Sequence, residues 1–193
     1  MAETFSEHYA FVGPSVPERE EPIPAKTRPL VYVSLGTVIH DRKRFCKNCV
    51  EALADMDVDA VLSVGTAENL GALGQLPPNI QAAEQVDQLS VLRRADVFLT
   101  HCGMNSASEA IWYGVPTVLD PQQSEEAAVA DRMEELGMGL RLWSEDPDHI
   151  RATLEKVLDD PSYKERTERI ARSFRDAGGA RRAAEYILAC RKT

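Results

Sequence analysis

The stretch DVFLTHCGMNSASEAIWYGVPTVLD, residues 96–120, contains two short apolar segments separated by a segment with helical spacing. The apolar residues of 96–101 predict a buried strand, and those of 116–120 predict a second strand. Between them, residues 105–114 predict a helix, and Gly114 ends it because glycine readily adopts the backbone conformation that closes a helix. Strands joined through a helix form a βαβ unit, so we expect the two strands to be parallel.

The same alternation continues on both sides of this unit. Short apolar runs without polar alternation are typical of strands that are buried on both faces. The sequence therefore predicts an α/β fold, with a parallel sheet of about six strands and helices on both faces. The further strands are expected at 30–36, 59–65, 79–86 and 137–142, and the further helices at 42–56, 87–95, 124–137, 147–158, 161–175 and 179–191.

Residues 1–29 differ in composition from the rest of the chain. Five prolines lie between positions 14 and 29, separated by charged residues, which is typical of an extended linker. The preceding segment FSEHYAFVGPS, residues 5–15, has too few apolar side chains to fold alone. We expect residues 1–29 to be the remnant of an interdomain linker and residues 30–193 to form one domain.

The composition limits what the chain binds and where it works. With 31 acidic and 22 basic residues among 193, its net charge of −9 repels polyanions, so nucleic acid is not an expected partner. Its four cysteines lack framework spacing, and packing in a helix explains the pair Cys46 and Cys49. No run of 18 apolar residues and no signal-peptide core occurs, so we expect a cytoplasmic protein without a membrane span.

Small polar residues gather where the strand of the quoted stretch passes into the helix. A helix start carries unpaired N–H groups and about half a positive charge, so it attracts anions such as phosphate. Gly103 would let an anion approach the backbone, while His101, Asn105 and Ser106 would add hydrogen-bond donors. Glu109, one turn later, could accept two hydrogen bonds from a vicinal diol. The alternative is that Ser106 and Glu109 form a capping box and bind no ligand.

The polar turns of the other βα units are expected close to this one. Ligands of open parallel sheets bind at the carboxyl ends of the strands, and all of those ends lie at one edge. The segments that should share this rim are 34–37, 65–66, 85–88, 101–106 and 121–126.

These motifs together resemble a known family. HCGMNSASEA, followed by GVPTVLDPQQSEE, resembles the donor-binding signature of the GT-B glycosyltransferases that use UDP-sugars, above all the bacterial macrolide-type group. VYVSLGT, VDQLSVLRRADVFLTH and AGGARRAAEYI match in order and spacing, and YAFVGPS resembles the segment between the two halves of these enzymes. The resemblance covers about residues 9–190. It implies a Rossmann-like, C-terminal donor-binding half, with UDP or a UDP-sugar as partner and no further cofactor.

The resemblance also implies a role for individual positions. His101, Asn105 and Ser106 would hold the diphosphate, with the loop of Ser34, Gly36 and Thr37 opposite and Gly103 admitting the phosphate. Gln88 and Glu109 would bind the ribose, and the backbone of Val86 would read the uracil edge. Met104, Glu125 and Glu126 would face the sugar. Simpler alternatives remain: a surface position for Gln88, a core position for Met104, and an acidic first helical turn for Glu125 and Glu126.

Two positions depart from the family pattern. Gln85 stands where the family usually has an aromatic residue that stacks on uracil, which puts the identity of the base in doubt. Glu126 stands where the family usually has glutamine. A carboxylate accepts hydrogen bonds but cannot donate them, which puts the identity of the sugar in doubt.

The reaction that the resemblance implies is an inverting, metal-independent transfer of a sugar from UDP-sugar or dTDP-sugar to an acceptor hydroxyl. The family's catalytic base is a histidine of an N-terminal acceptor-binding domain, and none of His8, His40, His101 and His149 fits that role. We therefore expect no catalytic residue and no metal site in this chain, and an isolated chain that is inactive without that domain. The alternatives are a natural split subunit and a non-catalytic nucleotide-sugar binding module.

Overall fold

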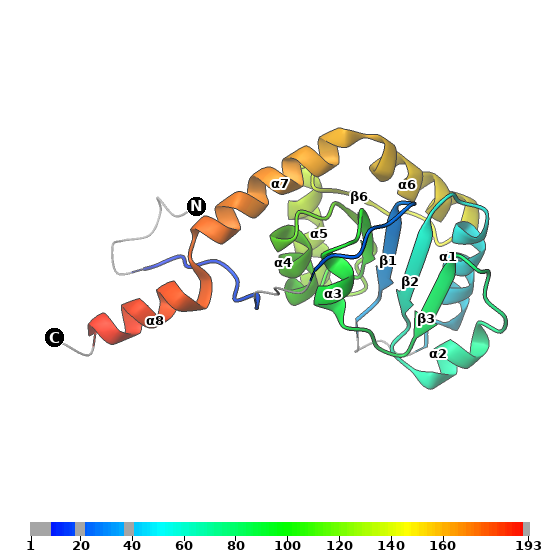
Figure 1. Cartoon of the computed structure of the whole chain (residues 1–193), viewed down its shortest axis with the longest axis horizontal. Coiled ribbons are helices and arrows are strands. Elements are labelled where there is room, and N and C mark those ends of the chain that lie inside the picture. Colours follow the sequence, from blue (N-terminus) through cyan, green and yellow to red (C-terminus); the bar gives the residue numbers. More distant parts are fainter. Residues whose placement is uncertain (1–8, 18–21, 37–40, 191–193) are drawn as a thin grey trace.

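The structure is a computed structural model that describes residues 9–17, 22–36 and 41–190 (Figure 1). Its strands form one six-stranded sheet in the order β3-β2-β1-β4-β5-β6, and every neighbouring pair is parallel. From β1 the chain adds β2 and β3 on one side, and then crosses to add β4, β5 and β6 on the other side. This reversal of strand order creates a crevice at the carboxyl ends of β1 and β4. The strands are β1 Leu30–Ser34, β2 Asp59–Ser63, β3 Ile80–Ala83, β4 Val97–Thr100, β5 Thr117–Leu119 and β6 Gly139–Arg141.

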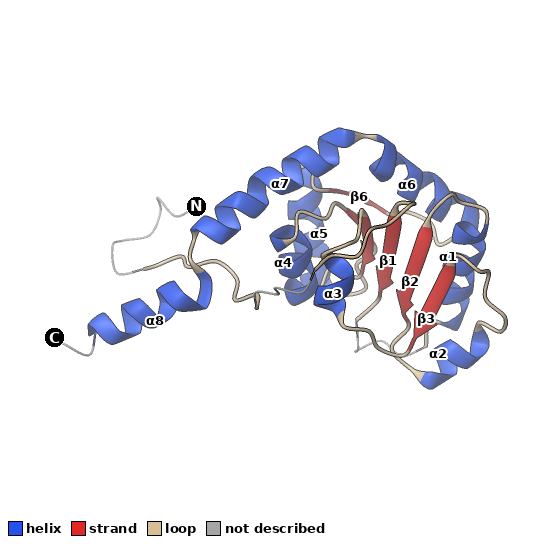
Figure 2. Cartoon of the chain, in the orientation of Figure 1, coloured by secondary structure: helices blue, strands red, loops and turns tan. Residues whose placement is uncertain are grey.

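Helices cover both faces of this sheet (Figure 2). One face packs against α1 and α6, and the other packs against α3, α4 and α5, with α7 lying on α4. The predicted α/β fold with a parallel sheet of six strands is therefore confirmed. The helices are α1 Lys43–Ala54, α2 Ala67–Ala72, α3 Gln88–Leu92, α4 Met104–Trp112, α5 Ser124–Glu135, α6 Pro147–Asp159, α7 Pro161–Asp176 and α8 Gly179–Cys190.

The central position of β1 in the sheet explains why its sequence does not alternate between apolar and polar residues. Val31 and Val33 point into the core on the side of α1 and α6, whereas Leu30 and Tyr32 point into the core on the side of α3 and α4. All five residues of β1 are buried. A strand that is covered on both faces needs apolar side chains at successive positions, which removes the alternation of a half-exposed strand.

The structure differs from the expected elements in two ways. Several strands end earlier than their apolar runs, because the last residues of each run already belong to the turn at the carboxyl edge. The six-residue helix α2 was not predicted. It is too short to show a helical period in the sequence, and it is held by Thr66, whose side chain accepts a hydrogen bond from the Asn69 N–H at 3.2 Å.

The amino-terminal segments lie against two parts of the domain. Lys26 donates hydrogen bonds to the Arg94 carbonyl and to the Asp96 carboxylate. The Gly179 N–H donates to the Val12 carbonyl at 2.6 Å, which ties residues 9–17 to the junction of α7 and α8. Helix α8 extends away from the sheet (Figure 1). No helix in the described part of the chain is long and apolar enough to cross a membrane.

Candidate functional site

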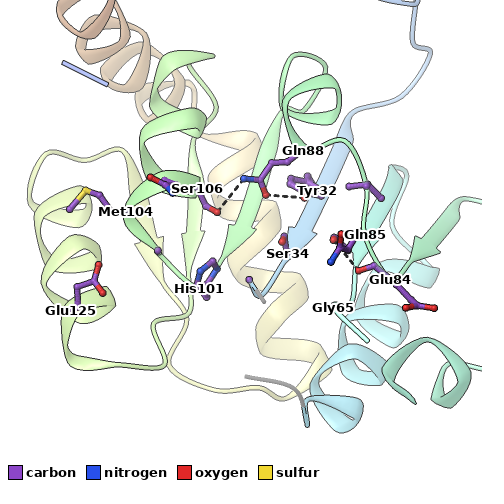
Figure 3. Close-up of a pocket in the computed structure, with 15 residues that line it drawn as sticks. Tyr32, Ser34, Gly65, Glu84, Gln85, Gln88, His101, Met104, Ser106 and Glu125 are labelled. Atoms are coloured by element: carbon purple, nitrogen blue, oxygen red, sulfur yellow. Dashed lines mark hydrogen bonds between the residues drawn. The ribbon is translucent and has the colours of Figure 1, made fainter. Parts of the chain in front are cut away.

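A cavity of about 490 Å³ lies at the carboxyl ends of β1 and β4, where the strand order changes direction. It is formed by the ends of β1 and β2, by the turns that follow the first four strands, and by the first turns of α3, α4 and α5. Figure 3 shows His101 and Ser34 in its middle, Met104 and Glu125 on one side, and Glu84 and Gln85 on the other. Its lining residues are Tyr32, Ser34, Gly36, Ser63, Gly65, Glu84, Gln85, Val86, Gln88, His101, Gly103, Met104, Asn105, Ser106 and Glu125.

Most residues that the sequence placed on the rim do line this cavity. The structure brings together Ser34, Gly36, Val86, Gln88, His101, Gly103, Met104, Asn105, Ser106 and Glu125. Thr37 lies outside the described residues. Met104 is 57% exposed, so its alternative as a core residue is wrong. What each of these residues binds stays a prediction.

Three lining residues were not expected from the sequence: Tyr32, Ser63 and Glu84. Tyr32 and Ser63 lie inside strands rather than in the turns after them. A polar atom inside an otherwise apolar strand was the available signal, because such an atom needs a partner when it is buried.

The imidazole of His101 fits into a gap that two glycines leave open. A Cβ atom at Gly103 would lie 2.4 Å from His101 Nε2, and one at Gly36 would lie 2.6 Å from the same atom. Gly36 also has a φ of +74°, which disfavours any other residue. The two glycines therefore place the ring at the start of α4, beside the unpaired N–H groups of that helix.

The turn between β4 and α4 contains a backbone conformation that is rare outside glycine. Cys102 has a φ of +70°, and its side chain is fully buried. Its N–H donates to Thr100 Oγ1 at 3.1 Å, which holds the turn. Burial raises the pKa of the Cys102 thiol to about 12, so this thiol stays protonated and is a packing group rather than a nucleophile.

A hydrogen-bonded chain of side chains forms one wall of the cavity. The Tyr32 hydroxyl donates to Gln88 Oε1 at 3.0 Å, and Gln88 Nε2 donates to Ser106 Oγ at 3.2 Å and to Glu109 Oε2 at 2.6 Å. Glu109 does not itself line the cavity, and Gln88 connects it to the lining. Helix α4 begins at Met104 after Gly103 and has no side-chain cap. The capping box proposed as an alternative for Ser106 and Glu109 is therefore wrong.

Glu126 does not face the cavity, contrary to the expectation from the sequence. Its side chain is buried, and Oε2 accepts hydrogen bonds from the N–H groups of Gln122 at 2.7 Å and Gln123 at 3.0 Å. The carboxylate thus caps the start of α5, where free backbone donors attract a negative group. Its neighbour Glu125 is exposed and lines the cavity. The alternative of an acidic first turn is correct for Glu126.

The cavity lining combines carboxylates with the N-terminus of α4. The described lining includes the carboxylates of Glu84 and Glu125 but no lysine or arginine side chain. The N-terminus of α4, which lines the cavity, is the positive end of a helix dipole and carries unpaired N–H groups. Across the described ranges, no three His, Cys, Asp or Glu side chains gather in an arrangement that could hold a metal ion. That the site works without a metal stays a prediction.

Comparison with known proteins agrees with this geometry. Residues 47–177 match the family described as "Erythromycin biosynthesis protein CIII-like, C-terminal domain". The chain belongs to this EryCIII-like family. It is 37% identical to the NDP-glycosyltransferase YjiC of Bacillus subtilis (strain 168), over 98% of this chain and 50% of that protein.

Solved structures place the EryCIII-like domain in the GT-B glycosyltransferase fold. The calicheamicin glycosyltransferase CalG4 superposes with a TM-score of 0.88 and 37% identity, over 97% of this chain and 48% of CalG4. The glycosyltransferase VinC, solved in complex with dTDP, superposes with a TM-score of 0.73 and 28% identity, over 94% of this chain and 46% of VinC. The chain spans about half the length of the curated relatives it matches, and it corresponds to the C-terminal, macrolide-type glycosyltransferase domain.

Proposed function

We propose that the chain is the donor-binding half of an inverting glycosyltransferase, which moves a hexose from UDP-sugar or dTDP-sugar to the hydroxyl of a small-molecule acceptor. The observation that carries this proposal is the cavity at the β1–β4 crevice, where His101, Ser106 and the N-terminus of α4 lie beside the pair Gln88 and Glu109. The first group suits a diphosphate, and the pair suits the hydroxyls of a ribose. VinC, whose structure was solved with dTDP, supports a nucleoside diphosphate as ligand.

The residues present define what this half contributes to the reaction. As the bond between the sugar and the diphosphate breaks, negative charge grows on the diphosphate, and the N–H groups at the start of α4 stabilise it. His101 adds a donor at the same place. Glu125, exposed on the cavity wall beside Met104, is positioned for the hydroxyls of the transferred sugar.

The acceptor and the base that removes its proton belong, on this proposal, to another domain. His8 and His40 lie outside the described residues. Among the other two histidines, His101 lies in the donor cavity, and His149 Nε2 accepts a hydrogen bond from the Trp143 N–H at 3.3 Å. The isolated chain should therefore bind the donor without transferring the sugar.

Titration calorimetry with UDP, dTDP and uridine tests donor binding. We expect at least one of the two diphosphates to bind more tightly than uridine, because the diphosphate meets the start of α4 and His101. A chain that binds neither diphosphate would contradict the proposed site.

A transfer assay with UDP-glucose and a phenolic acceptor tests the division of labour. We expect almost no product from the chain alone, and product when an acceptor-binding half from a relative is supplied. Robust transfer by the chain alone would show that the base and acceptor site are present here after all. If the chain binds the nucleotide but no product forms, with or without the acceptor-binding half, a non-catalytic binding module is favoured.

A further inference from the structure

Tyr32 is a residue of the hydrophobic core whose hydroxyl reaches the cavity. Its side chain is 1% exposed, and its ring stacks on Phe98 with a centroid distance of 4.6 Å and an interplanar angle of 14°. The two residues are also register partners in β1 and β4, the central strands on either side of the crevice. Two buried strands and a stacked ring leave the hydroxyl one fixed position.

The hydroxyl contacts the side chain at the centre of the cavity's hydrogen-bonded wall. Glu109 Oε2 lies 2.6 Å from one end of the Gln88 amide, and an ionised carboxylate only accepts hydrogen bonds. That end must therefore be the NH₂ group, so the carbonyl oxygen of Gln88 faces Tyr32. The Tyr32 hydroxyl donates to this oxygen at 3.0 Å and satisfies it.

The Tyr32 hydroxyl keeps the proton that this contact needs. Burial raises the pKa of Tyr32 to about 12, although hydrogen bonds from Ser34 and Ser63 act to lower it. Tyr32 therefore remains a donor at neutral pH. A phenylalanine would fill the same space against Phe98 equally well, so the hydroxyl is explained by its contact with Gln88 and the two serines rather than by packing.

We propose that Tyr32 is a positioning residue that holds Gln88, and through it Glu109, in the geometry that binds the hydroxyls of the donor nucleotide. In this proposal the Tyr32 hydroxyl contacts Gln88, and Gln88 and Glu109 contact the nucleotide. Gln88 lies at the first position of the short helix α3, and its NH₂ group donates to Ser106 and Glu109. The Tyr32 hydroxyl holds the other end of the same amide, so the side chain is fixed before the ligand arrives, which favours binding. This inference rests on the proposed function of the cavity.

A double-mutant cycle tests the inference, with UDP as the probe and calorimetry as the readout. Tyr32→Phe keeps the stacked ring and removes only the hydroxyl, and we expect UDP affinity to fall about threefold to tenfold, the effect of one net hydrogen bond. In the Gln88→Ala background the same change should alter affinity less than about twofold, because its target is gone. Tyr163→Phe is the matched control, since Tyr163 packs in the core on the α6 side and does not line the cavity.

Nuclear magnetic resonance gives a second readout that needs no ligand. The side-chain NH₂ signal of Gln88 is identified by its loss in Gln88→Ala. We expect Tyr32→Phe to shift and broaden this signal while Tyr163→Phe leaves it in place. An unchanged signal, or equal loss of UDP affinity in both backgrounds, would overturn the inference and leave the proposed function standing. Failure of the unmodified chain to bind UDP or dTDP would overturn the proposed function, and with it the role of Tyr32 in nucleotide binding.

Discussion

At the scale of single residues, the cavity depends on the glycines beside His101 as well as on its polar side chains. Gly103 has φ −56° and ψ 139°, which any residue adopts, so its backbone does not require glycine. The requirement comes from His101, whose Nε2 atom lies 2.4 Å from the position that a Cβ would take. A Cβ at Gly103 would therefore force the imidazole to move from this position.

Gly103→Ala is therefore expected to displace the His101 ring and to weaken UDP binding at least about tenfold, because a charge-assisted hydrogen bond to phosphate contributes roughly 1.5–3 kcal/mol. Uridine binding should change much less, since uridine lacks the phosphates. Calorimetry with both ligands measures the difference.

The matched control is Gly71→Ala. Gly71 lies in α2, and a Cβ there would meet no atom within 4 Å. This change should leave UDP affinity unchanged and should stabilise the helix by up to about 1 kcal/mol. Unchanged UDP affinity in Gly103→Ala would show that the ring adjusts without cost and that the glycine is not needed for binding.

At the scale of elements, two of the helices at the rim, α4 and α5, begin in different ways. Helix α4 has no side-chain cap, which leaves its N–H groups free for a ligand. Helix α5 is capped by Glu126, whose carboxylate accepts from two backbone N–H groups. The uncapped helix is the one that points into the cavity, and the capped one supplies an adjacent wall through Glu125.

Substitutions at the two neighbouring glutamates should therefore change different properties, namely stability for Glu126 and sugar binding for Glu125. Glu126→Ala leaves two backbone donors without their acceptor, so the free energy of unfolding should fall by about 1–3 kcal/mol, with UDP-glucose affinity unchanged. Glu125→Ala should weaken UDP-glucose relative to UDP, and stability should change by less than about 1 kcal/mol. Urea unfolding and calorimetry on both variants measure this. Loss of UDP-glucose affinity in Glu126→Ala without destabilisation would restore its role as a ligand of the sugar.

At the scale of the whole molecule, a cluster of charged side chains around the buried Asp120 joins segments that are far apart in the sequence. Arg42, before α1, lies 2.8 Å from Asp120 after β5 and 3.2 Å from Glu145 after β6. Burial is the largest influence on the Asp120 carboxyl and raises its pKa from 3.8 to about 6, although Arg42 lowers it. Glu145 contributes to this rise.

This cluster predicts a pH dependence of global stability with a definite sign. Because the pKa of Asp120 is higher in the folded state, the folded protein binds this proton more tightly than the unfolded chain does. The contribution of Asp120 to stability is therefore largest at low pH, falls as the pH rises from 3.8 towards 6, and is lost above that. The difference amounts to at most about 3 kcal/mol.

Urea unfolding at several values between about pH 4 and about pH 7 tests this prediction. The free energy of unfolding should decrease across this range in the unmodified protein, and Asp120→Asn should flatten that decrease because its amide does not titrate. Asp146→Asn is a suitable control, since Asp146 is exposed at the start of α6. Equal slopes in all three proteins would show that Asp120 titrates in the folded state as it does in the unfolded chain.

The sequence alone determined the fold class and most of the cavity. The period and length of the apolar runs around residues 96–120 are local properties of the chain, and they were sufficient to predict a parallel sheet with helices on both faces. Since all carboxyl ends of such a sheet meet at one edge, the turns could be assigned to one rim before any contact was known. The resemblance of the motifs then indicated the family.

The tertiary structure decided which side chains face the cavity and which support it. Glu125 and Glu126 are adjacent and chemically alike, but the start of α5 turns one into the cavity and the other onto its own backbone. Tyr32 and Gln88 meet although 56 positions separate them, because β1 lies next to β4 and α3 packs above that pair. Such contacts depend on the register of strands and on helix orientation, which long-range packing sets and no local pattern in the sequence contains.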